Sequence, residues 1–102
     1  MVLELADLRI QPGRGAEFET ALRRGVEEVI ARAEGFLVYR VENGIESPER
    51  YLLQIEWDTL ESHTAGLRQS PSFARWRAIV RPFFAAPPQV EHFERLAEPA
   101  RA

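Results

Sequence analysis

Strand-like and helix-like segments follow one another along this chain in the order β-α-β-β-α-β. Residues 2–11 partly alternate apolar and polar side chains and end at a Pro-Gly pair, which predicts a strand closed by a turn. Residues 36–42 and 51–57 predict two more strands, and the Asn43-Gly44 pair between them indicates an antiparallel hairpin. The last strand is predicted over residues 89–96.

Helical spacing marks the segments between these strands. Within residues 16–33 the apolar side chains recur every three or four positions, at Phe18, Leu22, Val26, Val29 and Ala33. Gly25 lies on the same face, where glycine costs a helix about 1 kcal/mol relative to alanine, so it predicts close packing of the helix on the sheet. The second helical region predicts a short helix over residues 60–68 and another that starts at Ser70-Pro71 and ends before Pro82.

This order predicts an α+β fold of the ferredoxin-like type. In this βαββαβ arrangement a four-stranded antiparallel sheet carries its helices on one face. The length of the chain fits one domain, which we place at residues 1–96. Residues 97–102 are expected to form a flexible C-terminal tail.

Bulky side chains are expected on both faces of the sheet. On the strand at residues 36–42, Phe36 and Val38 are predicted to face away from Leu37, Tyr39 and Val41. An antiparallel sheet that is apolar on both faces needs a second cover besides its helices. The simplest cover is a second copy of the chain, so we expect a homodimer.

The composition excludes several classes of chemistry. The chain has no cysteine and no lysine, which removes thiolate nucleophiles, zinc-thiolate sites and Schiff bases. The net charge of −3 argues against a nucleic-acid partner, and no apolar run approaches the ~20 residues that cross a membrane. The chain also lacks the Gly-rich loop that binds nucleotide phosphates. It has no signal-peptide pattern, so we expect a cytoplasmic protein. All 13 basic residues are arginine, which indicates a GC-rich, bacterial coding sequence.

Both histidines lie in one stretch, residues 57–92, and are the first candidates for proton transfer near neutral pH. His63 is the candidate catalytic residue, as a base toward a phenol or as a hydrogen-bond donor to a substrate oxygen. Its alternative role is to hold a helix on the sheet. His92, on the last strand, is a candidate substrate contact, and its alternative role is at a sheet seam or interface. The two histidines have no metal-ligand spacing, so no metal site is predicted.

Aromatic and charged residues supply the other candidates for substrate binding. Trp57 and Trp76 are expected to form a wall for a planar ligand, and Phe83 to roof the pocket, although aromatic residues at these spacings also build cores and interfaces. Asp7 and Arg40 are candidates for a charge inside the pocket, with a buried pair or simple exposure as the alternatives. The arginines of the second helical region, Arg68, Arg75, Arg77 and Arg81, are predicted to form a solvated face.

The same stretch carries a resemblance to a known family. Its runs are Trp57-Asp58-Thr59-Leu60-Glu61-Ser62-His63, Ser70-Pro71-Ser72-Phe73-Ala74-Arg75-Trp76, Pro82-Phe83-Phe84 and Val90-Glu91-His92-Phe93. With the opening strand, its Pro12-Gly13 turn and Glu34-Gly35-Phe36, these runs resemble the antibiotic biosynthesis monooxygenase domain family over nearly the whole chain. The resemblance implies a dimeric α+β barrel with a pocket between the sheet and the helices of each protomer.

Characterised members of that family include cofactor-independent oxygenases of polycyclic aromatics, quinol oxygenases and haem-degrading enzymes. The haem-degrading branch pairs an Asn on the first strand with a Trp and a His. Here the first strand has Ala6 and Asp7 with no Asn, and Gly66-Leu67 stands where that Trp would be. The resemblance therefore implies oxygenation rather than haem degradation.

We expect a monooxygenase without a cofactor, acting on a small aromatic substrate (a quinol, phenol or anthrone) and molecular oxygen. The alternative is a non-catalytic dimer that binds a small molecule or fatty acid, or a stress-response protein of the same fold, because fold does not determine function. A pocket imidazole beside a polar partner would favour the enzyme. A pocket lined only by apolar groups, with His63 bonded to backbone, would favour the alternative.

Overall fold

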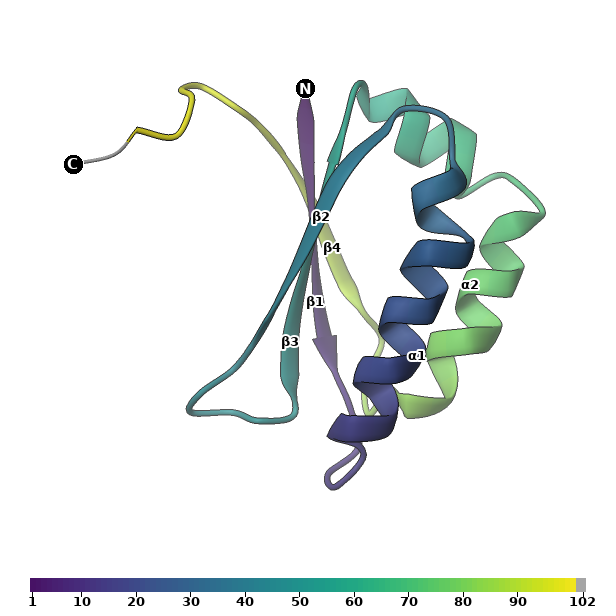
Figure 1. The fold of residues 1–102 in the computed structure, drawn as a ribbon, viewed down its shortest axis with the longest axis vertical. Coiled ribbons are helices and arrows are strands. Elements are labelled where there is room, and N and C mark those ends of the chain that lie inside the picture. The colour runs from purple at the N-terminus through teal and green to yellow at the C-terminus, as the bar shows by residue number, and fades with distance from the viewer. Residues whose placement is uncertain (101–102) are drawn as a thin grey trace.

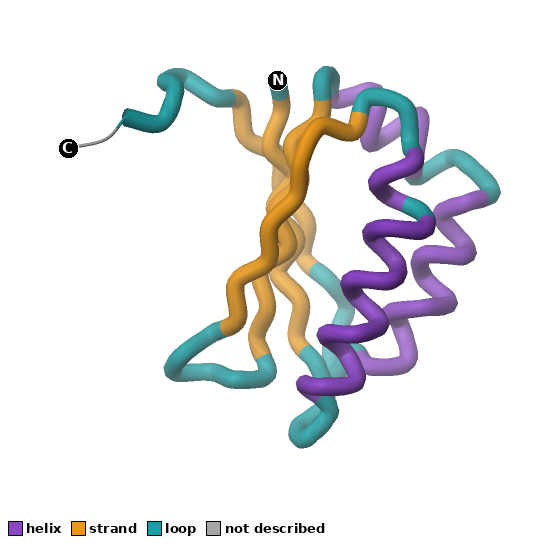
Figure 2. Tube along the Cα trace, viewed as in Figure 1, coloured by secondary structure: helices purple, strands orange, loops and turns teal. Residues whose placement is uncertain are grey.

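A computed structural model describes residues 1–100 and has the predicted ferredoxin-like fold, with a sheet covered by helices on one side (Figure 1). The four strands are antiparallel and lie in the order β2-β3-β1-β4. Their bounds are β1 (Val2–Arg9), β2 (Phe36–Asn43), β3 (Arg50–Trp57) and β4 (Gln89–Glu94). The two α-helices that cover the sheet are α1 (Gly15–Glu28) and α2 (Ser72–Val80), which lie side by side in Figure 2.

Three short helical turns depart from the predicted helices. The first predicted helix leaves the α-helical geometry after Glu28 and continues as a 3₁₀ turn, η1 (Ile30–Arg32). The predicted helix at residues 60–68 is mainly a π-helical turn, η2 (Ser62–Leu67), because the Arg68 N–H donates to the His63 carbonyl five residues earlier (2.9 Å). A 3₁₀ turn, η3 (Arg81–Phe83), follows α2 and contains the predicted stop, Pro82.

The strand and tail boundaries also differ from prediction at the C-terminal end. β4 ends at Glu94, two residues before the predicted end. Residues 97–100 form no helix or strand, and residues 101–102 of the expected tail lie outside the described residues. In the part of the chain that the structure describes, every helix is too short or too polar to cross a membrane.

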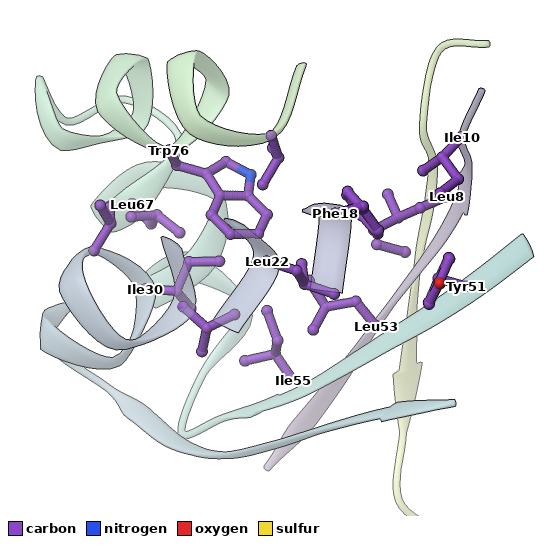
Figure 3. Close-up of a cluster of buried hydrophobic side chains, with 14 of the residues drawn as sticks. Leu8, Ile10, Phe18, Leu22, Ile30, Tyr51, Leu53, Ile55, Leu67 and Trp76 are labelled. Atoms are coloured by element: carbon purple, nitrogen blue, oxygen red, sulfur yellow. The ribbon is translucent and has the colours of Figure 1, made fainter. Parts of the chain in front are cut away.

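The core lies between the sheet and the two helices (Figure 3). Alternate residues of the central strands point toward the helices, since side chains alternate along a strand. The largest buried side chains are Trp57, Tyr51, Phe18, Leu53, Ile55, Val26 and Val80. β1 contributes Ala6 and Leu8 to this face, and also the buried carboxyl group of Glu4.

A bulge in β2 corrects the predicted alternation of that strand. Phe36 pairs with Trp57 and Val38 pairs with Glu56, so Leu37 is an extra residue in the ladder. One extra residue reverses the face of everything on one side of it. Phe36 therefore shares the helix-covered face with Tyr39 and Val41, whereas the neighbouring residues Leu37 and Val38 are both exposed.

Gly25 packs against the other helix rather than against the sheet. A Cβ atom at this position would lie 2.8 Å from two ring carbons of Trp76, which projects from α2 into the core (Figure 3). The predicted close packing is present, but its partner is α2. Both contacts are to atoms of one rigid indole, so the whole ring would have to shift to admit a Cβ atom.

We expect Gly25→Ala to lower the free energy of unfolding by about 1 kcal/mol. Overpacking a core costs about 1–3 kcal/mol, which exceeds the ~1 kcal/mol gained in helix propensity. Urea unfolding followed by circular dichroism measures the difference. Gly66→Ala is the control, because its added Cβ would meet nothing nearer than 3.7 Å. A Gly25→Ala protein more stable than the parent would contradict the packing argument.

Candidate functional site

A cavity of about 590 Å³ lies between the sheet and the helical layer. The sheet lines it with Ala6, Leu8 and Leu53, and the helical side lines it with Phe73, Trp76 and Val80. Phe84 and the residues that follow it, up to Pro88, complete the wall. Its size and apolar lining are typical of small-molecule sites. Two titratable side chains, Glu4 and His63, also face this space.

Glu4 is a carboxyl group held on the apolar face of β1. Its exposure is only 6 %. The Trp57 Nε1–H donates to Oε1 of Glu4 (2.9 Å), and Nε2 of His63 lies 3.3 Å from the same oxygen. Both contacts use Oε1, which leaves Oε2 as the carboxyl oxygen available toward the cavity.

His63 is positioned by the π-helical turn and by the side chains around it. Its ring stacks on Trp57, with centroids 5.5 Å apart and an interplanar angle of 19°. Its Nδ1 lies 2.7 Å from Nε2 of His92 on β4. His92 is directly opposite Glu4 in the β1–β4 register, so the sheet itself brings both groups to His63. The result is a row of three titratable groups, Glu4, His63 and His92, which we call the proton chain.

Burial shifts the pKa of every member of the proton chain. Burial raises the pKa of Glu4 to about 7, against the opposing effects of the Trp57 hydrogen bond and the Arg68 charge. Burial also lowers the pKa of His63 to about 4, with the charges of His92 and Arg68 acting in the same direction. The pKa of His92 is lowered as well, by burial and by Arg68. At neutral pH both imidazoles are therefore uncharged, and Glu4 is the group that exchanges a proton.

The direction of the hydrogen bonds in the proton chain follows from the state of Glu4. When Glu4 is protonated, its O–H donates to Nε2 of His63, and the His63 Nδ1–H donates to Nε2 of His92. When Glu4 is ionised, His63 donates through Nε2 to the carboxylate and accepts at Nδ1 from the Nε2–H of His92. A proton that arrives at Glu4 can thus leave through His92, and both imidazoles are uncharged before and after the transfer.

The structure separates the other predicted site residues into two groups. Trp76 lines the cavity, whereas Trp57 is fully buried behind His63 and contacts Glu4 instead. Phe83 packs on Phe18, with ring centroids 5.7 Å apart, and lies outside the cavity lining, where its neighbour Phe84 stands.

Asp7 and Arg40 lie on the opposite face of the sheet from the cavity. Asp7 forms an ion pair with Arg50 (2.8 Å), and Arg40 donates to the side chain of Gln54 (3.2 Å). The sheet places neither charge inside the cavity, because on each strand these residues alternate with the residues that face the helices.

Sequence reasoning missed Glu4 and did not predict that three arginines of the solvated face also line the cavity. Glu4 has the same strand parity as Ala6 and Leu8, so a carboxylate on an apolar face was the available signal. Arg68, Arg77 and Arg81 are exposed, as expected of a solvated face, but all three also line the cavity.

The proton chain has no geometry for a metal. The His63 and His92 nitrogens face each other at hydrogen-bond distance instead of converging on a shared point. Across residues 1–100, no set of three or more potential ligands is arranged to hold a metal ion.

The sequence of the chain matches the sequence model of the antibiotic biosynthesis monooxygenase family over residues 1–79. This chain belongs to that family. The matched region includes Glu4, Trp57, His63 and Trp76, whereas His92 and Arg81 lie beyond it. Membership of the antibiotic biosynthesis monooxygenase family supports a monooxygenase function.

Relatives of this chain align with it over nearly their whole length. The uncharacterized protein YczJ of Bacillus subtilis (strain 168) is 38% identical over 94 residues, which cover 92% of this chain and 98% of YczJ. A Bordetella bronchiseptica structure named for the same family is 36% identical, with a TM-score of 0.87 and coverage of 94% of this chain and 97% of that one. SnoaB, a cofactor-independent oxygenase from Streptomyces nogalater, is 18% identical to this chain and shares its fold, with a TM-score of 0.81. The aligned region covers 95% of this chain and 94% of SnoaB.

Proposed function

We propose that this protein is a cofactor-independent monooxygenase that oxidises a small aromatic substrate such as a quinol, phenol or anthrone. The observation that carries the proposal is the proton chain, which begins at a buried carboxyl group in an apolar cavity and ends at a half-buried histidine. An apolar cavity with a few polar groups and shifted pKa values is the usual form of an active site.

Glu4 is the base in this proposal, and His63 and His92 carry the proton away. A base works best when its pKa is close to the operating pH, and the pKa of about 7 for Glu4 meets that condition. His63 is a weak base, with a pKa of about 4; its Nδ1 is already hydrogen-bonded to His92, and its Nε2 lies 3.3 Å from the Glu4 carboxyl group. His63 therefore contributes as a relay and as an orienting contact for Glu4.

The reaction balances without an added cofactor. For an anthrone-type CH₂ group, Glu4 removes one proton, and the resulting carbanion transfers one electron to O₂. The substrate radical and superoxide then combine to form a C–O bond, and a proton that returns to Glu4 through His92 and His63 converts the peroxide anion to a hydroperoxide. Loss of water from the hydroperoxide breaks the O–O and remaining C–H bonds, so the products are a ketone and one water molecule.

The surroundings of Glu4 support this chemistry over the non-catalytic alternative. The His63 ring is hydrogen-bonded to the side chain of His92 and contacts that of Glu4 at 3.3 Å, and Glu4 and His63 both line the cavity. The apolar walls at Phe73, Trp76 and Phe84 keep water from the carbanion and offer rings on which an aromatic substrate stacks.

Oxygen uptake tests the proposal. We expect the purified protein, treated with a metal chelator, to consume O₂ with at least one member of a panel of quinols, phenols and anthrones, one O₂ per ketone or quinone formed from an anthrone-type carbon. Heat-denatured protein is the control for autoxidation. Failure of every substrate class at high protein concentration would contradict the proposed function.

We also propose that the protein is a homodimer joined through the uncovered face of the sheet. This face carries five apolar side chains, Leu3, Leu5, Val38, Leu52 and Phe93. Val38 and Phe93 are substantially exposed in the single chain, at 48 % and 44 %, as is the bulged residue Leu37 at 48 %. Burying such a patch is favourable at roughly 25 cal/mol per Å². Sedimentation equilibrium at micromolar concentration distinguishes the dimer from a monomer of 11.7 kDa.

A further inference from the structure

The cavity has a cationic rim as well as an apolar interior. Arg68, at the end of η2, and Arg77 and Arg81, four residues apart on α2 and η3, all line it. Glu4 is the sole acidic residue in the described lining. The protein as a whole has a net charge of −3, so the positive charge at this opening is local and runs against the overall balance.

The rim arginines lack the carboxylate partners that most other described arginines have, a lack they share with Arg23, Arg32 and Arg40 outside the cavity. Arg14, Arg24, Arg50, Arg75 and Arg95 each form an ion pair with a carboxylate. Among the described residues, no carboxylate lies within ion-pair distance of Arg68, Arg77 or Arg81. Arg77 and Arg81 are also a like-charge pair at i,i+4, an arrangement that destabilises a helix by a few tenths of a kcal/mol.

We infer that the cavity takes an aromatic carboxylate, with the ring between Trp76 and the sheet and the carboxylate at the rim arginines. A guanidinium presents a planar fork of donors that matches a carboxylate with two parallel hydrogen bonds. The bound anion relieves the repulsion between Arg77 and Arg81 and supplies the partner that this pair lacks within the chain. This inference names the substrate class of the proposed monooxygenase site and rests on that proposed function.

The two ends of the cavity then have separate tasks. Arg68 is close enough to the proton chain for its charge to lower the pKa of Glu4, His63 and His92. Arg77 and Arg81 influence none of these groups comparably and lie on the helical side of the opening. The carboxylate held at Arg77 and Arg81 leaves the rest of the ring system inside the apolar walls, toward Glu4.

A matched pair of probes tests the inference by binding alone. Isothermal titration calorimetry measures the Kd of 2-naphthoate and of 2-naphthamide, which share a ring system and differ in charge. We expect 2-naphthoate to bind about tenfold more tightly, as one charge-assisted hydrogen-bonded pair provides. We also expect its Kd, and not that of the amide, to rise between 50 and 500 mM NaCl. Equal Kd values for the two probes would overturn the inference.

Paired variants assign the preference to the rim. Arg77→Gln with Arg81→Gln is expected to bring the ratio of the two Kd values close to one. Arg23→Gln with Arg32→Gln removes the same charge from exposed positions outside this cavity and is expected to keep the tenfold ratio. A ratio that survives loss of Arg77 and Arg81, or that disappears equally in the control, would overturn the assignment. If decanoate bound more tightly than 2-naphthoate, the inference that the ligand is aromatic would be overturned.

These measurements fail or succeed independently of turnover. Selective binding of 2-naphthoate with no oxygen uptake on any substrate would leave the carboxylate site standing and remove the monooxygenase function. Oxygen uptake that shows no preference for carboxylated over amidated aromatic substrates would support the monooxygenase function and remove the carboxylate site.

Discussion

Glu4→Gln lowers the turnover number for the best substrate of the oxygen-uptake panel by at least about a hundredfold. General acid–base catalysis contributes about 10²–10⁴ in rate, and glutamine cannot accept a proton. The amide keeps the size of the side chain and an oxygen that accepts from the Trp57 Nε1–H, so the change acts on proton transfer more than on packing. Stopped-flow or oxygen-electrode kinetics at saturating substrate measure the loss.

The pH profile and a matched glutamate separate catalysis from a structural effect. In the parent protein the rate is expected to rise with pH through an apparent pKa of about 7, the value for Glu4, and this limb disappears in Glu4→Gln. Glu27→Gln, at an exposed position of α1 outside the cavity lining, is expected to keep the parent rate within about twofold. Undiminished turnover in Glu4→Gln would rule out Glu4 as the base.

Local signals in the sequence were sufficient for the order and type of the main elements. The Asn43-Gly44 turn, the helical spacing from Phe18 to Val29 and the stop at Pro82 each act within a few residues, and the structure has β2–β3, α1 and α2 where these signals predict them. The bulge at Leu37 has no such signal, since no glycine or proline marks it. Its position depends on the pairing of β2 with β3.

The site was predictable in part, because its members come from distant segments. His63 was named from its residue type and its place after a strand, but its partners are 59 and 29 residues away at Glu4 and His92. Their meeting depends on β4 lying beside β1 with Glu4 opposite His92 in register. The topology of a ferredoxin-like sheet predicts that neighbour, so reading strand parity across β1 and β4 together would have found the pair.

Opposite pH dependence of stability is expected for variants at the two ends of the Glu4–His63 contact. The folded pKa of Glu4, about 7, exceeds its ordinary 4.5, so the folded state holds the proton more tightly and Glu4 lowers the free energy of unfolding as pH rises from 4.5 to 7. The folded pKa of His63, about 4, is below its ordinary 6.5, so the unfolded state holds the proton more tightly and His63 raises stability from pH 4 to 6.5. Each effect is about 3 kcal/mol at 1.36 kcal/mol per pKa unit.

These two effects largely cancel in the parent protein, and removing one partner exposes the other. Relative to the parent at each pH, Glu4→Gln is expected to gain about 3 kcal/mol between pH 4.5 and 7, and His63→Gln to lose about as much between pH 4 and 6.5. Urea unfolding at half-unit pH intervals measures both differences, with Glu27→Gln on the exposed face of α1 as the control whose difference from the parent stays flat. Parallel curves for Glu4→Gln and His63→Gln would show that burial does not drive the two pKa values in opposite directions, and the assignment of Glu4 as the proton-exchanging group would fall with it.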